Sequence, residues 1–171
     1  MNNNTFVHKY LTPLIDKNDV CVDMTAGNGN DTLFLCCLSK KVYAFDISKE
    51  AIEKTRERTR ECDNLILIRD SHVNVDRYVK EKVRLFLFNL GYLPKAASYS
   101  VTRAEDSLSA LKKAFELLEK DGYIVITFYL GHPGGKDEYY LLKRYIENKK
   151  ITVQETYRQD KPDSPITMIL R

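Results

Sequence analysis

The sequence lacks long apolar runs, and its first residues lack the features of an export signal. Its apolar stretches are much shorter than the roughly 20 residues that a membrane-spanning helix needs. Residues 1–5 form neither a basic segment nor an apolar one, so no secretory signal is predicted. We therefore expect a cytoplasmic protein that makes no use of a membrane.

Cysteine pairs at metal-binding spacing are also absent. The four cysteines are Cys21, Cys36, Cys37 and Cys62, and no Cys-x-x-Cys pair occurs among them. Neither a zinc site nor a disulfide framework is expected from this pattern. We predict reduced thiols, most of them buried, and no metal site.

Charge of one sign is not in large excess. The 171 residues carry a formal net charge of +3, and the pI is about 8.6. This mild excess is compatible with an acidic partner such as RNA, although dedicated nucleic-acid-binding domains often have a higher pI. No repeat or linker divides the chain, and its length is typical of one domain, so we expect a single domain over residues 1–171.

The sequence does contain a regular alternation of short apolar runs and longer segments of helical periodicity. Asp121-Gly122 is interpreted as the stop signal of one helix. The alternation predicts an α/β fold with a mostly parallel sheet covered on both faces, closed at one edge by an antiparallel hairpin. Strands are predicted at 20–24, 41–46, 65–69, 83–89, 123–130, 151–158 and 166–170, and helices at 31–38, 49–61, 75–80, 103–119 and 136–148.

A glycine-containing loop follows the first predicted strand. Its glycines allow a tight turn and a close approach of backbone to a ligand. A dinucleotide site favours a third small residue where this chain has Thr32, and Asp23 would repel a pyrophosphate. Asp23 can instead organise the loop and face the ammonium of a methionine group, which favours S-adenosylmethionine. A purely structural turn is the alternative. The loop runs Asp23-Met24-Thr25-Ala26-Gly27-Asn28-Gly29-Asn30-Asp31.

Two further acids end predicted strands. Asp46 follows the second strand, where a carboxylate can accept hydrogen bonds from ribose hydroxyls. The alternative is that Asp46 caps the next helix, but Ser48 can serve as that cap. After the third strand, Asp70, Ser71 and His72 are predicted to lie at the adenine edge, with a structural histidine as the alternative for His72.

Four ordered motifs, at 22–35, 42–47, 88–94 and 131–135, together with Val7-His8, resemble the YtqB-like family of rRNA methylases. The resemblance covers nearly the whole chain. It implies a class I methyltransferase fold, Rossmann-like with a seven-stranded sheet, and S-adenosylmethionine as cofactor. It also implies an MnmM-type activity that methylates the amine of 5-aminomethyl-2-thiouridine at wobble position 34 of tRNA. The chain departs from the family at Lys95–Ser98, where Gly-Gly-Asp-Lys is frequent, and at Asn30, where a histidine is usual.

The expected cofactor contacts follow from these motifs. They are Asp23, Thr25, Ala26, Gly27, Asn28, Gly29, Asn30, Asp31, Thr32, Asp46, Ile47, Ser48, Asp70, Ser71, His72 and Asn89.

The loop Asn89-Leu90-Gly91-Tyr92 is the predicted catalytic segment. Amino-methylating enzymes often carry Asn-Pro-Pro-Tyr after this strand, so by analogy the Asn89 side-chain carbonyl and the Leu90 backbone carbonyl accept hydrogen bonds from the amine. Tyr92 is expected to stack on the uracil, as aromatic side chains do on unstacked bases. The alternatives are a turn residue at 89 and a packed surface aromatic at 92.

The substrate is expected at Gly91, Tyr92, His132, Gly134, Gly135 and Lys136. The 131–135 loop suits a lid or a phosphate nest, or is a plain loop. Lys136, Lys143, Arg144, Lys149 and Lys150 are expected to contact a tRNA anticodon stem-loop, with a solvated helix face as the alternative. Without a separate RNA-binding domain, these loops or a homodimer partner would grip the RNA.

Two other functions stay open from the residues. One is an rRNA or small-molecule N-methyltransferase, because fold does not fix substrate. The other is a non-catalytic module that binds S-adenosylmethionine or RNA.

Overall fold

A single seven-stranded sheet organises the protein, with strand order β3-β2-β1-β4-β5-β7-β6. The computed structural model describes residues 1–90, 104–159 and 164–171. The strands are β1 (Val20–Asp23), β2 (Lys41–Phe45), β3 (Leu65–Ile68), β4 (Val83–Leu90), β5 (Leu118–Phe128), β6 (Val153–Arg158) and β7 (Ile166–Leu170). The helices are α1 (Asn3–Leu11), α2 (Asn30–Leu38), α3 (Lys49–Arg58), a short 3-10 helix η1 (His72–Asn74), α4 (Val75–Tyr78), α5 (Ala104–Leu117) and α6 (Gly135–Asn148).

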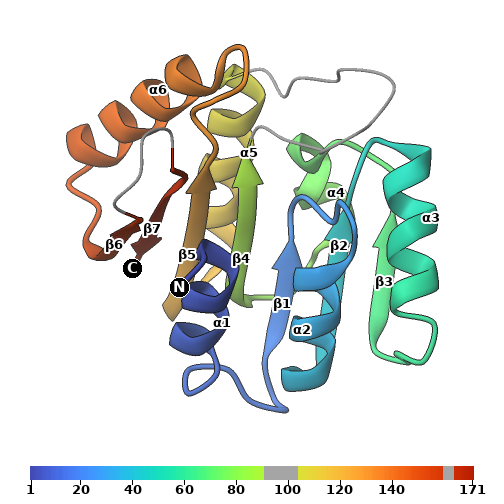
Figure 1. Ribbon diagram of the computed structural model, residues 1–171. Coiled ribbons are helices and arrows are strands. Elements are labelled where there is room, and N and C mark those ends of the chain that lie inside the picture. The colour runs from blue at the N-terminus through green and yellow to red at the C-terminus, as the bar shows by residue number, and fades with distance from the viewer. Residues whose placement is uncertain (91–103, 160–163) are drawn as a thin grey trace.

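The strands β1 to β5 pair in parallel, and β7 pairs antiparallel with both β5 and β6. The predicted parallel sheet and the closing antiparallel hairpin are therefore confirmed. The strand order reverses between β1 and β4, and in Figure 1 the carboxyl ends of the parallel strands point to the same edge of the sheet. An open sheet of this kind binds its ligand at that edge, beside the reversal point.

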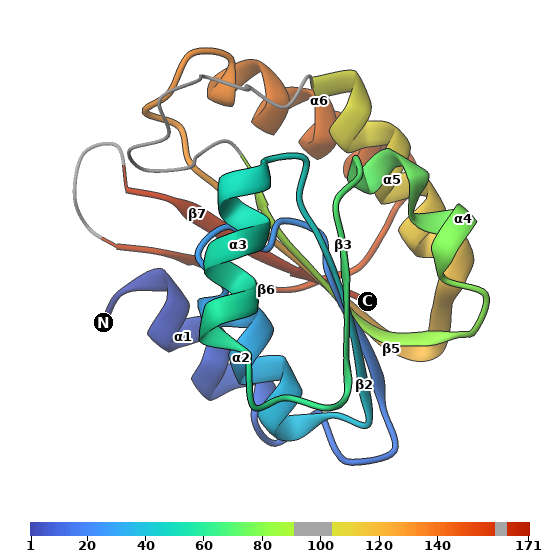
Figure 2. The ribbon, with the colours of Figure 1, turned by 90° about the vertical axis from the view of Figure 1, so that its right-hand side faces the viewer.

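Helices cover both faces of the sheet. Val7 and Leu11 of α1 and Leu35 of α2 pack with Leu85 and Val125 on one face. The other face carries α4, α5 and α6, whose buried residues pack with the remaining inward side chains of the strands. Figure 2 shows these two helical layers on opposite sides of the sheet.

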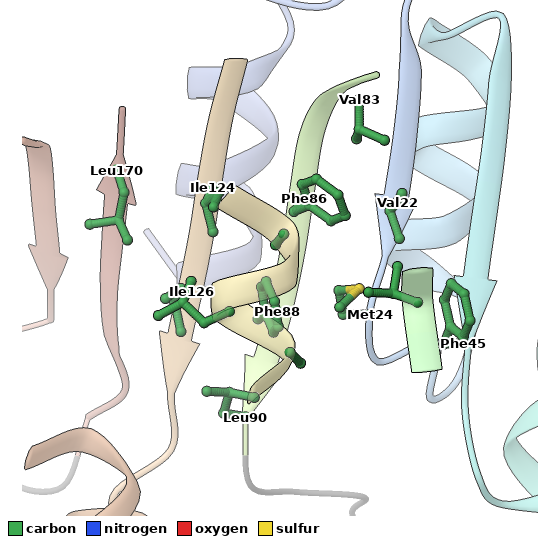
Figure 3. Close-up of a cluster of buried hydrophobic side chains, with 14 of the residues drawn as sticks. Val22, Met24, Phe45, Val83, Phe86, Phe88, Leu90, Ile124, Ile126 and Leu170 are labelled. Atoms are coloured by element: carbon green, nitrogen blue, oxygen red, sulfur yellow. The ribbon is translucent and has the colours of Figure 1, made fainter. Parts of the chain in front are cut away.

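The larger core lies between the sheet and α5. Phe86 and Phe88 of β4 are fully buried, and Figure 3 shows them between the side chains of β1 and β5. Their neighbours Leu85 and Leu87 point to the opposite face, so every residue of this part of β4 is buried. A continuous apolar strand of this kind is the expected centre of a sheet with both faces covered.

The sequence did not predict α1. The Asn2 side chain caps this helix by accepting a hydrogen bond from the Thr5 backbone N–H at 2.8 Å. Asn3, in its first turn, donates to Thr167 Oγ1 of β7 at 2.9 Å. The helix is thus fixed by a partner 164 residues away in sequence, which local periodicity cannot reveal.

The predicted stop at Asp121-Gly122 was wrong. Helix α5 ends at Leu117 and β5 begins at once, so Gly122 lies inside the strand. A Cβ at Gly122 would lie 2.8 Å from Leu118 Cδ1 and 3.0 Å from the Arg84 carbonyl oxygen. The glycine therefore permits a close approach of β4 and β5 near a register shift, instead of ending a helix. Among the described helices, none is long and apolar enough to cross a membrane.

Candidate active site

Asp23, the last residue of β1, organises the loop that follows this strand. This carboxylate is fully buried, and its two oxygens accept hydrogen bonds from the Thr25 backbone N–H at 3.0 Å and from Thr32 Oγ1 at 2.6 Å. Burial, and next the negative charge of Asp31, raise the pKa of Asp23 to about 7. The predicted organising role is confirmed, whereas a contact between Asp23 and an ammonium stays a prediction.

Two glycines give the loop its shape. Gly27 and Gly29 have φ angles of 54° and 76°, in the left-handed region that disfavours other residues. A Cβ at Gly29 would lie 2.9 Å from Thr55 Cα, so this glycine lets the loop pack against α3. A Cβ at Gly27 would meet only the Thr25 carbonyl, at 3.7 Å, so the space beside Gly27 is open.

Backbone hydrogen bonds connect the rest of this loop to β2 and α3. Ala26 donates its N–H to the Phe45 carbonyl at 2.8 Å, which ties the loop to β2. The Asn28 carbonyl accepts a hydrogen bond from Arg58 Nε of α3 at 2.7 Å. Asn30, the first residue of α2, is exposed.

Asp46, after β2, joins two loops. Its Oδ2 accepts a hydrogen bond from the Gly27 N–H at 3.0 Å, and its Oδ1 accepts one from the Ser48 N–H at 2.9 Å. Ser48 is the N-cap of α3 and accepts from the Ala51 N–H at 3.3 Å, as expected. Each carboxylate oxygen of Asp46 thus keeps one lone pair for a ligand. Ile47, next to it, is 49% exposed.

The turn after β3 is a compact polar cluster. Asp70 accepts hydrogen bonds from the Ser71 N–H, from Asn74 Nδ2 and from the Tyr78 hydroxyl. Burial opposes ionisation of Asp70, but the hydrogen bonds from Asn74 and Tyr78 outweigh it and lower the pKa. These bonds occupy much of the capacity that was predicted to serve the adenine.

His72 lies under the first loop. Its Nδ1 is 3.0 Å from the Met24 carbonyl oxygen, and its ring meets Phe88 edge-on. Burial lowers the pKa of His72, which favours the neutral ring. Its buried Nε2 has no hydrogen-bond partner among the described residues. His72 therefore both packs in the core and retains one free polar atom.

The end of β4 meets the first loop. The Asn89 backbone N–H donates to Thr25 Oγ1 at 2.8 Å, and Asn89 Nδ2 donates to Asp31 Oδ2 at 2.8 Å. The Leu90 carbonyl accepts from the Tyr129 N–H at 3.2 Å, and its side chain is fully buried. One lone pair of the Leu90 carbonyl is thus already used by the sheet. Gly91 and Tyr92 lie outside the described residues.

Asp31 has a second partner that the sequence did not indicate as part of the site. Its Oδ1 lies 2.6 Å from Nε2 of His8, on α1. The His8 ring is stacked on Phe34 of α2, with 3.8 Å between the ring centroids. The resemblance at Val7-His8 is the only sequence signal for this histidine, because its contact with Asp31 joins two separate helices.

The predicted substrate loop lies beyond β5. His132 Nδ1 is 2.9 Å from the Pro133 carbonyl oxygen, and Gly134 is the N-cap of α6. A Cβ at Gly135 would lie 2.4 Å from the Tyr129 carbonyl oxygen, so the chain folds back closely here. Lys136 is exposed, whereas Lys143 lies 3.7 Å from Glu147. The predicted basic strip is thus partly neutralised within α6.

A cavity of about 970 Å³ borders the first loop at Asn28 but does not reach the other groups of the candidate site. It is lined by Asn28 and Leu33, by Cys62, and by charged residues of both signs on and just after α3. Asp46, Asp70 and Asn89 are not among its lining residues. We therefore place the candidate site by its converging polar groups at the carboxyl edge and not by this cavity.

The family model described as "Putative rRNA methylase" matches residues 42–171 of this chain. The chain belongs to the rRNA methylase family. The match includes β2 from Val42 onwards and all of β4, with Asp46 and Asn89, and begins after the glycine loop.

A curated relative also matches most of the chain. The chain is 37% identical over 149 residues to a "tRNA (mnm(5)s(2)U34)-methyltransferase, chloroplastic" from Arabidopsis thaliana, covering 77% of this chain and 54% of the relative. The chain thus spans about half of the length of that curated relative.

Two solved structures of bacterial methyltransferases match this chain over nearly their full length. One is a "putative methyltransferase" from Streptococcus mutans in complex with SAH, with a TM-score of 0.87, 34% identity, and coverage of 99% of this chain and 97% of the other. The second is a "putative rRNA-methylase" from Clostridium thermocellum, with a TM-score of 0.88, 32% identity, and coverage of 100% and 97%. The fold of this rRNA methylase family member is that of class I S-adenosylmethionine-dependent methyltransferases.

Proposed function

We propose that this protein is an S-adenosylmethionine-dependent methyltransferase that acts on the aminomethyl nitrogen of a wobble uridine in tRNA. The observation that carries the methylation of a nitrogen is the geometry at Asn89. Its Nδ2 is held by Asp31, so its Oδ1 is turned away from that carboxylate, at the same sheet edge as Gly27 and Asp46. Among the described residues, none donates a hydrogen bond to this oxygen.

The residues at this edge fit the cofactor. The open space beside Gly27 allows a ligand to approach the backbone, and Asp46 retains lone pairs for two ribose hydroxyls. The exposed Ile47 offers an apolar surface to an adenine ring. His72, in the turn after β3, contributes a buried Nε2 that has no hydrogen-bond partner among the described residues. The Streptococcus mutans relative, which was crystallised with SAH, supports the same assignment.

When bound, S-adenosylmethionine supplies an electrophilic methyl group. The acceptor must react as the neutral amine, because an ammonium has no lone pair; an ammonium would give its extra proton to water before it binds. We propose that Asn89 Oδ1 accepts a hydrogen bond from the neutral amine and so directs the lone pair towards the methyl group. The bound cofactor would then supply its methyl group to this nitrogen, and the bond between methyl carbon and sulfur would break. The Asn89 carbonyl offsets the positive charge that grows on the nitrogen, which finally loses a proton to water.

The substrate assignment rests on the plant relative and on charge. That relative is named for mnm⁵s²U34 in tRNA, and it shares 37% identity with this chain. A net charge of +3 favours a polyanion over a small cation. We propose 5-aminomethyl-2-thiouridine in the tRNA anticodon loop as the acceptor and the 5-methylaminomethyl nucleoside as the product. The family description favours rRNA as the second candidate.

One experiment decides between these substrates. The purified protein and isotopically labelled S-adenosylmethionine are incubated in parallel with tRNA and with rRNA from a strain that lacks this protein. Digestion and mass spectrometry then identify the labelled nucleoside. We expect label in a methylaminomethyl uridine of tRNA alone. Label in rRNA would replace the tRNA assignment, and label in neither would reject both.

The matched control is Asn89→Ala. This variant should bind S-adenosylhomocysteine with nearly the affinity of the wild type, but turn over on the order of 100-fold more slowly, because one preorganised polar contact to the reacting group is lost. A near wild-type single-turnover rate would exclude Asn89 from the chemistry.

A further inference from the structure

We propose that His8 is a positioning residue, which fixes the orientation of the Asn89 side-chain amide through Asp31. This inference rests on the proposed N-methylation and deepens it, because it assigns a role to a helix that no cofactor motif includes. Three separate elements meet here: α1 carries His8, the first turn of α2 carries Asp31, and β4 ends with Asn89.

A single carboxylate connects the other two side chains. Asp31 Oδ1 lies 2.6 Å from His8 Nε2, and Asp31 Oδ2 accepts from Asn89 Nδ2 at 2.8 Å. His8 and Asn89 lie 23 and 58 residues from Asp31 in sequence. A bridge built from such distant segments exists only after the fold is complete.

The hydrogen bond between Asn89 and Asp31 determines which end of the Asn89 side-chain amide faces the substrate amine. The two ends of an asparagine amide have nearly the same shape but opposite hydrogen-bonding character. An ionised carboxylate only accepts hydrogen bonds, so it holds the NH₂ end of Asn89 and leaves the carbonyl end for the substrate.

His8 holds the Asp31 carboxylate by the oxygen that Asn89 does not use. The side chain of Asp31 is 10% exposed, so few positions are open to its two oxygens. With Oδ1 bound to His8 Nε2, Oδ2 stays directed at Asn89 Nδ2. The orientation of the Asn89 amide therefore depends on the donor that His8 supplies.

The His8 ring is itself held in place. It stacks on Phe34 with an angle of 3° between the ring planes, and its side chain is 30% exposed. In the tautomer with its proton on Nε2, the ring donates to Asp31 whether or not Nδ1 also carries a proton. A positioning role therefore needs the donor but not the titration of His8, whereas a general base would need the neutral ring.

This difference defines the variants. His8→Phe keeps a ring to stack on Phe34 and removes the donor. His8→Gln keeps a side-chain N–H donor and removes the titration. Lys9→Gln is the matched control, because Lys9 is the exposed neighbour on α1. If the phenylalanine variant does not fold, as judged by thermal melting, His8→Leu takes its place.

The first measurement is kinetic and uses the full-length protein with tRNA. His8→Phe should lower kcat at least about 10-fold, with little change in the KM for tRNA or in S-adenosylhomocysteine affinity. His8→Gln should restore most of kcat with the wild-type pH profile, and Lys9→Gln should equal the wild type. A wild-type kcat in His8→Phe overturns the proposal, as does a glutamine variant as slow as the phenylalanine one.

The second measurement needs no activity. In ¹H–¹⁵N spectra of the protein alone, the side-chain NH₂ signals of Asn89 are identified by their loss in Asn89→Ala. They should shift and exchange faster with solvent in His8→Phe, and remain as in the wild type in His8→Gln. Unchanged signals in His8→Phe would overturn the proposal. If the wild type fails to methylate tRNA, the proposed function is rejected, and these spectra still decide the role of His8.

Discussion

At the scale of single residues, Asp46 has the most direct test. It is the only acid of the site that links the first loop to the start of α3, among the residues described by the structure. Asp46→Ala removes the proposed acceptors of the ribose hydroxyls and releases the Gly27 N–H. We expect S-adenosylhomocysteine binding to weaken by about 1.5–3 kcal/mol, as for hydrogen bonds to a charged group. Isothermal titration calorimetry measures this change.

The control for Asp46 is Glu50→Ala. Glu50 is an exposed carboxylate in the first turn of the same helix, paired with Lys54. Its loss changes the charge near the site but no proposed contact, so affinity should stay within a factor of about two of the wild type. Equal affinities in Asp46→Ala and the wild type would remove Asp46 from the cofactor site.

Glu138 permits a second residue-scale prediction, on stability. It is buried in α6, accepts a hydrogen bond from Ser107 Oγ of α5 at 2.5 Å, and has a pKa raised by burial to about 7. A carboxyl whose pKa is higher in the folded state stabilises the fold below its unfolded pKa. That contribution is lost as the pH rises from about 4.5 to about 7.

We therefore expect Glu138→Gln to gain stability relative to the wild type as the pH is raised from 5 to 8, by at most about 3 kcal/mol. Free energies of unfolding from urea titrations at the two pH values give this difference. Asp137→Asn, one residue away and exposed, should show no such change. Part of the slope should remain in Glu138→Gln, because the raised pKa of Asp23 acts in the same direction. The prediction fails if the two variants behave alike.

The sequence predicted individual residues well where the signal was local. Asp23, the glycines and Asp46 lie at fixed positions after strands, and the structure places them together as expected. His8 could not be found in this way, because its partner Asp31 is reached only when α1 docks on α2. Asp70 was expected to serve a ligand, but side chains of its own turn take up much of its hydrogen-bonding capacity.

At the scale of elements, the start of α6 depends on a close approach at Gly135. A Cβ there would lie 2.4 Å from the Tyr129 carbonyl oxygen and 2.7 Å from His132 Nε2. Gly135→Ala must therefore displace backbone atoms, and we expect a loss of about 1–3 kcal/mol in stability. The same shift should alter the 131–135 loop and raise the KM for tRNA. Thermal and urea unfolding give the first effect, and steady-state kinetics give the second.

Gly131, in the same loop, provides the control for Gly135→Ala. A Cβ at Gly131 would have no atom within 4 Å, so Gly131→Ala should change stability by less than about 0.5 kcal/mol. If both alanine variants are equally stable, the close packing at Gly135 does not matter for the fold.

Elements were predicted from sequence with differing success. The strands and most helices were found because alternating apolar runs and helical periodicity are local properties. Their ends were less accurate: the helix expected at 49–61 ends at Arg58, and the strand expected at 123–130 begins at Leu118 and ends at Phe128. The boundary between α5 and β5 depends on pairing of Leu118 with Val83, which no local signal records.

At the scale of the whole molecule, the topology explains why these residues meet. Because β1 lies between β2 and β4, the loops that follow these three strands converge at one edge of the sheet (Figure 1). Asp23 and Asp46 come from neighbouring strands, and Asn89 comes from the other side of the reversal point. The sequence predicted this edge from the alternation of strands and helices. The α1 layer, which adds His8, was not predicted, and a homodimer stays a prediction.

The mild positive charge of the molecule leads to a last prediction, on RNA binding. Lys136 is exposed at the start of α6, beside the 131–135 loop, and is proposed to contact tRNA phosphate. Lys136→Glu should raise the KM for tRNA several-fold and leave S-adenosylhomocysteine affinity unchanged. It should also reduce the slope of log affinity against log salt by about one unit, since each phosphate contact releases counterions. Filter binding of tRNA between about 50 and 200 mM salt gives the slope, while steady-state kinetics give the KM and calorimetry gives the S-adenosylhomocysteine affinity. Lys40→Glu makes the same change of charge on an exposed residue at the start of β2, at the opposite edge of the sheet, and should leave tRNA affinity nearly unchanged. If the two variants weaken tRNA binding equally, only the net charge matters, and the carboxyl edge has no preferred contact with RNA.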